Sequence, residues 1–346
     1  MRALVGIAAL VALATPVFAA ESPLQPKLWP SVEGVAKKLA SDLSGIACGP
    51  ERGGRRGCVL VSDEKRAVIF ATLSEGRIVA GPTMAVLAKH ERDAAGAEID
   101  NAEADLEAVS RDGDTYWVFG SASTKRRPGK DGGCTPVAAR RHVYRFAVDP
   151  ATDLPAFAVD DERPAPEIRR IDRLPEILAR LPELRDVVGA DRCADDGGFN
   201  IEGGAVVRGV MAVGLRAPLG PDGSALAVRL DAEALASGGD PRPRLHRLAL
   251  GAGMGIRDLA PAAGGFLVLA GPSVSDDGGE RASSTIWFWA GDDRPPHRLA
   301  ALGGLPKKAK PEGLLVLGED ATGFRVLVLS DGVAGGAPAE YRLPRR

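Results

Sequence analysis

Acidic residues recur at the start of strand-like segments, and these residues are the ones whose spacing is best able to do chemistry. Carboxylates stand in the stretches DLEAVS, NIEGGAVV, IRDLAP and KPEGLLVL, as Glu107, Glu202, Asp258 and Glu312, while Ser44 has the same place in DLSGIAC. Oxygen ligands without histidine or cysteine suit a hard cation such as Ca²⁺ or Mg²⁺. The four acids are therefore candidate metal ligands, with Ca²⁺ the expected ion, if the fold brings them together.

Two other uses of these acids stay open. Converging carboxylates repel one another unless a cation, protonation or a basic side chain neutralises them. Arg257, beside Asp258, and Arg216 offer such pairing inside the protein. The acids could instead accept hydrogen bonds from the backbone of a neighbouring module and act only as latches, or take part in catalysis directly.

Two further rows of residues repeat in register with the acids. Two positions earlier, on the same strand face, stand Asp42, Asp105, Asn200, Ile256 and Lys310. The following strand of each repeat ends in Asp63, Ser121, Arg216, Pro272 and Asp331. Mixed residue types at symmetric positions indicate a shaped ligand site. The candidate ligand-binding residues are Asp63, Ser121, Arg216, Arg257 and Asp331.

The elements that must position these residues form an internal repeat. Five stretches share a polar-started strand, a Gly/Asp turn, an apolar strand and an alternating third strand, and RIVAGPTMAVL, PRLHRLAL and PHRLAAL add a fourth. Repeated units of four antiparallel strands are typical of β-propeller blades. The sequence predicts an all-β propeller of five blades, or six if the long gap between Glu107 and Glu202 hides another.

That gap is interpreted as an insertion in blade two, at about residues 122–198. It contains a short amphipathic helix near Pro175, with Leu174, Ile177 and Leu178 on one face. The last repeat lacks a clear fourth strand, which the segment PKLWPSVEGVAKKL near the N-terminus could supply. We expect the two ends of the chain to pair in one blade and close the ring.

The first twenty residues predict export. MRALVGIAALVALATPVFAA has a basic start, a short apolar run and a small-residue exit, which is the pattern of a signal peptide cut near Ala19 or Ala20. The mature domain is then 21–346, periplasmic or secreted, with no later apolar stretch long enough to span a membrane. Export permits disulfides. We prefer Cys48 with Cys58 and Cys134 with Cys193 among the three possible pairings.

Composition and motifs exclude several function classes. Forty-four Lys and Arg against 46 Asp and Glu give a net charge of −2, which argues against nucleic-acid binding. The four histidines have no ligand spacing, and neither a GxSxG elbow nor a GKS/T phosphate loop occurs. We expect a monomer.

The motifs together resemble a known family. DLEAVSRDGDTYWVFGSAS, FNIEGGAVVRGVMAVGLRAPL, GIRDLAPAAGGFLVLAGPS and KPEGLLVL are similar to exported bacterial β-propellers grouped as domain of unknown function 3616, over roughly residues 42 to 332. The pairs Glu202-Gly203 and Glu312-Gly313 resemble, more distantly, phytase-like and esterase-like propellers. That resemblance implies a Ca²⁺-dependent phosphoesterase, although Ser44-Gly45 and Asp258-Leu259 depart from the pattern.

Two function classes follow from these observations. The first is a module that binds a small-molecule or protein ligand and has an acidic central channel. The second is a divalent-cation-dependent hydrolase of phosphoesters or lactones. The sequence leaves open whether the protein is an enzyme.

Overall fold

The computed structural model describes residues 22–35, 41–92, 95–127, 133–274 and 283–345, and the predicted signal peptide lies outside them. Within this part of the chain the protein is almost entirely β-structure, with two short α-helices. No helix in the described residues is both long enough and apolar enough to cross a membrane.

Five antiparallel sheets of four strands form the blades of a propeller. Blade one contains β2 (Leu43–Cys48), β3 (Arg55–Ser62), β4 (Ala67–Ser74) and β5 (Arg77–Ala85). Blade two contains β8 (Leu106–Asp112), β9 (Thr115–Gly120), β12 (Val143–Ala147) and β13 (Arg169–Ile171). Blade three contains β14 (Asn200–Val207), β15 (Val210–Ala217), β16 (Ala225–Asp231) and β17 (Arg244–Leu248).

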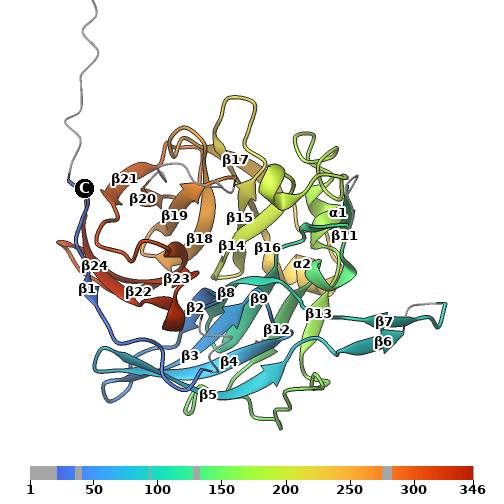
Figure 1. Cartoon of the computed structure of the whole chain (residues 1–346), viewed down its shortest axis with the longest axis horizontal. Coiled ribbons are helices and arrows are strands. Elements are labelled where there is room, and N and C mark those ends of the chain that lie inside the picture. The colour runs from blue at the N-terminus through green and yellow to red at the C-terminus, as the bar shows by residue number, and fades with distance from the viewer. Residues whose placement is uncertain (1–21, 36–40, 93–94, 128–132, 275–282, 346) are drawn as a thin grey trace, which may run out of the picture.

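The last two blades complete the ring. Blade four contains β18 (Met254–Ala262), β19 (Gly265–Pro272), β20 (Thr285–Trp289) and β21 (His297–Ala301). Blade five contains β22 (Lys310–Glu319), β23 (Gly323–Asp331), β24 (Ala339–Pro344) and, from the other end of the chain, β1 (Lys27–Leu28). Figure 1 shows the blades arranged around an axis, with β2, β8, β14, β18 and β22 innermost. The predicted five-bladed propeller is confirmed.

Each pair of neighbouring blades shares its own hydrophobic core. The strands are apolar because both faces of a blade pack against other blades, so five separate clusters of buried side chains lie between the blades. Blades two and three, for example, enclose Trp117 and Phe119 from β9 and Met211 and Val213 from β15. No single blade buries its core alone, so the stability of each blade depends on its neighbours.

The N-terminal segment closes the ring. Lys27 and Leu28 pair antiparallel with Glu340 and Ala339 of β24, which confirms the predicted pairing of the two chain ends. The same segment bonds the adjacent blades: the N–H of Leu24 donates to Ala301 O at 2.9 Å, and the N–H of Glu33 donates to Ile78 O at 2.9 Å. A stretch of about ten residues thus ties blades four, five and one together (Figure 1).

Two strands of blade two, β12 and β13, fall within the predicted insertion at 122–198. They divide the extra residues of this blade into three segments. Before β12 comes a hairpin of β10 (Thr124–Arg126) and β11 (Cys134–Pro136) and the 3₁₀ turn η1 (Ala138–Arg140). After β13 the predicted helix is present as α1 (Leu174–Leu178), followed by η2 (Ala194–Asp196). Leu174, Ile177 and Leu178 are all buried in the core between blades two and three.

Other short elements lie outside the five four-stranded sheets. A second hairpin, β6 (His90–Arg92) and β7 (Glu98–Asp100), projects from the edge of the propeller between blades one and two (Figure 1). The helix α2 (Ala232–Ser237), which the sequence analysis did not predict, follows β16 and is capped by Asp231, whose side chain accepts from the N–H of Ala234. The turn η3 (Ala334–Gly336) precedes β24.

Candidate functional site

A β-bulge occurs at the same place in the innermost strand of every blade. The pairing with the second strand skips one residue between Leu43 and Gly45, and equivalent skips occur in the other four blades. The skipped residues are Ser44, Glu107, Glu202, Arg257 and Glu312. A bulge leaves one residue outside the ladder and re-aims its side chain. The recurring acidic residue in the sequence is therefore the bulge residue of each inner strand.

Blade four departs from the predicted register by one residue. The sequence alignment put Asp258 in line with Glu202 and Glu312, but the bulge residue of β18 is Arg257. Asp258 instead accepts two backbone hydrogen bonds, from the N–H of Leu259 and from the N–H of Leu314 in blade five, both at 2.7 Å. Asp258 is thus a latch between two blades, the alternative use foreseen for these acids.

Small residues follow the bulge because neighbouring inner strands approach closely there. A Cβ added to Gly203 would lie 2.9 Å from the Ile256 side chain of the next blade. A Cβ added to Gly45 would lie 3.2 Å from the carbonyl oxygen of Glu107. The Glu-Gly pair is therefore a packing motif as well as a chemical one.

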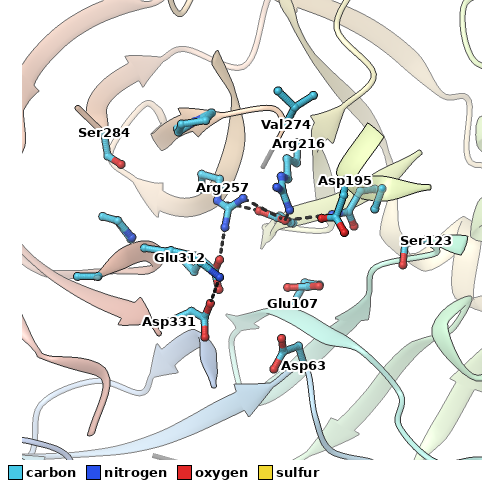
Figure 2. Close-up of a pocket in the computed structure, with 18 of the residues that line it drawn as sticks. Asp63, Glu107, Ser123, Asp195, Arg216, Arg257, Val274, Ser284, Glu312 and Asp331 are labelled. Carbon is cyan, nitrogen blue, oxygen red and sulfur yellow. Dashed lines mark hydrogen bonds and ion pairs between the residues drawn. The ribbon is translucent and has the colours of Figure 1, made fainter. Parts of the chain in front are cut away.

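Arg257 joins two of the acids across the channel. Its Nε lies 2.9 Å from Glu202 Oε2, and its Nη2 donates to Glu312 Oε1. Burial acts against the charged form of Arg257, but the carboxylates of Glu202 and Glu312 still raise its pKa. Arg216, from the end of β15, adds a second cation at 3.1 Å from Glu202 Oε1. Figure 2 shows the link from Arg257 to Glu312 and Arg216 nearby.

A cavity of about 750 Å³ opens over these bulges at one mouth of the channel. Of the predicted ligand-binding residues, Asp63, Arg216, Arg257 and Asp331 line it, and of the predicted metal ligands Glu107, Glu202 and Glu312 do. Asp258 is not among the lining residues. The second strand of blade four contributes Gly271 as well as Pro272, and the aliphatic part of Arg257 packs over Gly271, where a Cβ would lie 2.9 Å from Arg257 Cγ.

Ser121 lies behind the wall rather than on it. It is fully buried, and its hydroxyl donates to Asp105. Asp105 also lies 2.9 Å from Arg140 Nη1, and Arg140 in turn pairs with Glu103. Asp105 and Arg140 line the cavity but were not among the predicted site residues. The position of Asp105, two residues before Glu107, was the available signal for it, and the basic pair Arg140-Arg141 in the blade-two insertion was the signal for Arg140.

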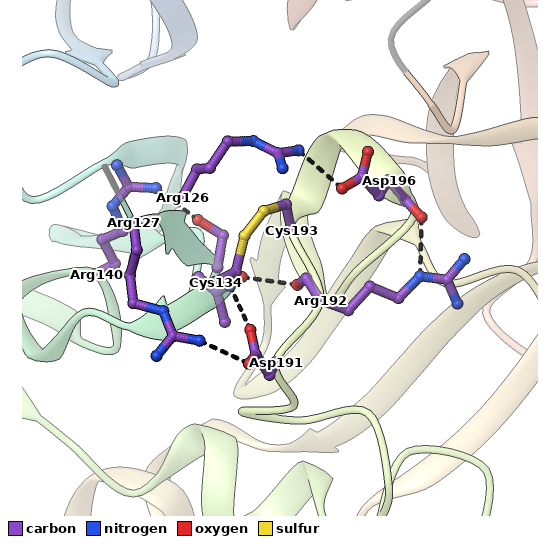
Figure 3. The surroundings of a disulfide bond; sticks show 10 residues. Arg126, Arg127, Cys134, Arg140, Asp191, Arg192, Cys193 and Asp196 are labelled. Atoms are coloured by element: carbon purple, nitrogen blue, oxygen red, sulfur yellow. Dashed lines mark hydrogen bonds and ion pairs between the residues drawn. A yellow bond between two sulfur atoms is a disulfide. The ribbon is translucent and has the colours of Figure 1, made fainter. Parts of the chain in front are cut away.

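The remaining wall is fixed by a disulfide. Cys134, in the β10–β11 hairpin, is bonded to Cys193, which itself lines the cavity. Arg126 pairs with Asp196 at 2.8 Å across the same junction, and Thr124 Oγ1 donates to Arg192 O at 2.7 Å (Figure 3). The other predicted disulfide, Cys48–Cys58, links β2 to β3. Both predicted pairings are confirmed.

Two carboxyl groups in the cavity have no partner. Among the described residues no hydrogen bond or ion pair involves Glu107, and Oδ1 of Asp63 is buried without a hydrogen-bond partner. In Figure 2 both lie apart from the network around Arg257. Burial, followed by the charges of Asp331 and Asp105, raises the pKa of Asp63 to about 7. Burial and the neighbouring Asp105 and Glu202 also raise the pKa of Glu107 well above its usual value.

Two buried neutral groups near the channel also lack a partner. Asn200, which lines the cavity and is 4% exposed, donates from Nδ2 to Glu202 Oε1 at 3.0 Å, but its Oδ1 accepts nothing. The hydroxyl of Ser44, the bulge residue of blade one, is 1% exposed and likewise has no partner. Buried polar groups are normally paired, so orphaned acceptors that face a cavity point to a ligand.

Three of the four predicted metal ligands, Glu107, Glu202 and Glu312, line one cavity, but Asp258 does not. Asp258 is occupied by backbone N–H groups, and the guanidinium of Arg257 pairs with both Glu202 and Glu312. In the part of the chain that the structure describes, no group of three or more His, Cys, Asp or Glu side chains is placed to hold a metal ion. The donor set therefore does not fit the predicted Ca²⁺ site.

Comparisons with solved structures found distant similarities. Zg3597, a family 117 glycoside hydrolase of the marine bacterium Zobellia galactanivorans, aligns over 93% of this chain and 90% of its own with 10% identity and a TM-score of 0.48. The α-L-arabinofuranosidase PaAbf62A from Podospora anserina aligns over 93% and 98% with 8% identity and a TM-score of 0.44. Among curated proteins none matches the sequence.

A family model does match. The model described as "Protein of unknown function (DUF3616)" covers residues 60–336, which include the bulges at Glu107, Glu202, Arg257 and Glu312 and most of the cavity. That range spans most of the chain and agrees with the motifs from which the resemblance was drawn. The chain therefore belongs to the DUF3616 family of proteins of unknown function, and in this member the family's sequence folds as a five-bladed propeller.

Proposed function

We propose that this protein is an exported binding protein that takes a small polar ligand in the cavity at the channel mouth. The observation that carries the proposal is a walled cavity of about 750 Å³ in which Asp63 and Glu107 are left without partners. Cavities of some 300 to 1,000 Å³ are typical of small-molecule sites.

The walls support a binding role because ion pairs and a disulfide hold several of their side chains without a ligand. Arg257 is held by two carboxylates, Lys310 donates to Asp331 at 2.8 Å, and the Cys134–Cys193 disulfide fixes the opposite side. A preorganised site loses less conformational entropy on binding.

A thermal-shift screen of small polar compounds tests this proposal. A compound present at a hundred times its dissociation constant should stabilise the protein by about 2.7 kcal/mol. Ser284→Trp, which places a large ring in the cavity wall, should abolish the shift. Ser237→Trp, on the exposed outer end of α2, is the matched control and should keep it. A shift that survives in the Ser284→Trp protein would place binding elsewhere and refute the proposal.

Hydrolysis is the second candidate, favoured by one observation. Asp63 and Glu107 have raised pKa values, and a carboxyl group that holds its proton near neutral pH can act as a general acid. Turnover of phosphoesters or lactones by the wild-type protein but not by Glu107→Gln would support it. If that turnover depended on added Ca²⁺, it would support the predicted metal site, although the ion pairs of Arg257 with Glu202 and Glu312 speak against that site.

A further inference from the structure

The unpaired groups of the cavity have one chemical property in common. Oδ1 of Asp63, the carboxyl group of Glu107 and Oδ1 of Asn200 are all hydrogen-bond acceptors, and they come from blades one, two and three. Asn200 is the independent observation, because it is an uncharged side chain that lines the same cavity, is 4% exposed, and has a buried oxygen without a hydrogen-bond partner. The site therefore lacks donors.

Most of the cations that line the cavity do not serve as donors to these acceptors, because they are already paired with carboxylates. Arg257 and Arg216 contact Glu202, Lys310 contacts Asp331, Arg140 and Lys125 contact Glu103, and Arg126 contacts Asp196. Lys307 is exposed to solvent at the rim. The groups left over are Lys307 at the rim and the carboxyls of Asp63 and Glu107, which carry negative charge once they are ionised.

Most of the charges that act on these two carboxyls are acidic. After burial, the charges of Asp331, Asp105, Asp42 and Glu64 raise the pKa of Asp63. After burial, the charges of Asp105, Glu202, Glu312 and Asp63 raise the pKa of Glu107, and Glu107 in turn raises the pKa of Arg257.

We propose that the ligand is an organic cation, an amine or guanidine, whose N–H groups donate to Asp63, Glu107 and Asn200. This inference rests on the proposed binding function and names its ligand class. A cation removes the repulsion between the carboxyls and satisfies the orphaned acceptors in one step. A bare metal ion fits less well, because the cavity is far larger than an ion and Arg257 separates Glu202 from Glu312.

Titration calorimetry on the mature protein tests the ligand class with three matched probes: cadaverine, the neutral pentanediol of the same length and the dianion glutarate. Cadaverine should bind, or, if its length does not suit the cavity, another diamine or agmatine should. The diol and the dianion should bind at least about tenfold more weakly than the cation. Asp63→Asn and Glu107→Gln should each weaken the cation by about tenfold or more. Glu167→Gln, an exposed acid outside the cavity, should leave binding unchanged.

The pH dependence of binding gives a second readout, which is measured first on the wild-type protein. A cation binds the ionised carboxylates, so a site titrating at about 7 should bind it about tenfold more tightly at pH 8 than at pH 6 and release protons on binding. Asp63→Asn should flatten this dependence.

The outcomes separate the two proposals. Binding of the diol or the dianion, blocked by Ser284→Trp and without binding of any amine, would keep the cavity as a ligand site and overturn the cation. Cation binding that neither Asp63→Asn nor Glu107→Gln weakens, or that is equal at pH 6 and pH 8, would also overturn it. If none of the three classes binds, the cation assignment is wrong. Failure of the whole small-polar screen would in addition refute the binding function.

Discussion

Arg257 is the buried cation that pairs with two acids of the channel. Its guanidinium is 7% exposed and lies between Glu202 and Glu312, which are 5% and 10% exposed. Taking charges out of water is costly, and only their mutual attraction and hydrogen bonds offset that cost. Removing one member of such a group leaves the others as uncompensated buried charges. A substitution here should therefore lower the free energy of unfolding more than a substitution at a surface ion pair does.

Arg257→Met should lower the free energy of unfolding by about 3 to 5 kcal/mol, because Glu312 would stay buried without this cation and Glu202 would keep only Arg216. Chemical unfolding at neutral pH measures this loss. Arg294→Met removes a guanidinium that is paired with Asp292 but 74% exposed, and should cost much less stability. Equal losses in the two variants would show that the buried cluster contributes no more than a solvated pair.

At the scale of the elements, each inner strand combines a bulge with a contact to the next blade. The bulge aims one side chain at the channel, and positions nearby bond to the neighbouring inner strand. Asp258 accepts from Leu314 N–H, and the hydroxyl of Ser110 accepts from Val206 N–H at 2.8 Å. The walls of the cavity are completed by elements outside the blades, chiefly the segment 302–309 between β21 and β22, the β10–β11 hairpin and the segment around Cys193.

The two disulfides should differ in their effect on the cavity although both stabilise the fold. Replacing Cys134 and Cys193 by Ser opens a loop of 59 residues and should cost about 4 kcal/mol, while the Cys48 and Cys58 pair, with a separation of 10, should cost about 3 kcal/mol. Only the first pair borders the cavity, so only its loss should weaken ligand binding. Calorimetric titration of both double variants measures this, and an equal loss of affinity would contradict it.

At the scale of the whole molecule, stability comes from closure of the ring. Every blade interface has its own hydrophobic cluster, and the interface between blades five and one, which brings the two ends of the chain together, includes Leu43, Leu60, Leu327 and Leu329. Closure also covers the outer edge of β24, which would otherwise expose unpaired backbone groups.

Deletion of residues 22–33 should lower the melting temperature and cause self-association. It removes β1 together with the backbone bonds to blades four and one, and it exposes the edge of β24 as a template for pairing. Differential scanning calorimetry and light scattering are the measurements. The variant Lys27→Ala/Leu28→Ala keeps the backbone bonds and should stay monomeric. A deleted protein as stable and monodisperse as this control would disprove the role assigned to closure.

The sequence by itself determined the repeat, a propeller of five or six blades, the pairing of the chain ends and the row of polar residues that begins each inner strand. These features depend on local alternation and on turn residues, which recur in every blade and are readable without the fold. Cys48 and Cys58, for example, bracket one hairpin, so their pairing follows from the strand pattern.

Only the tertiary structure decided which polar residue faces the channel in blade four and which acids are paired. A bulge adds one residue to a strand, and because Arg257 and Asp258 are both polar, the pattern cannot tell which of them the ladder skips. That single step replaces a carboxylate by a guanidinium, neutralises Glu202 and Glu312, and leaves Asp63 and Glu107 as the unpaired acids of the cavity. Charge balance is a property of side chains from different blades, so it exists only once the ring is closed.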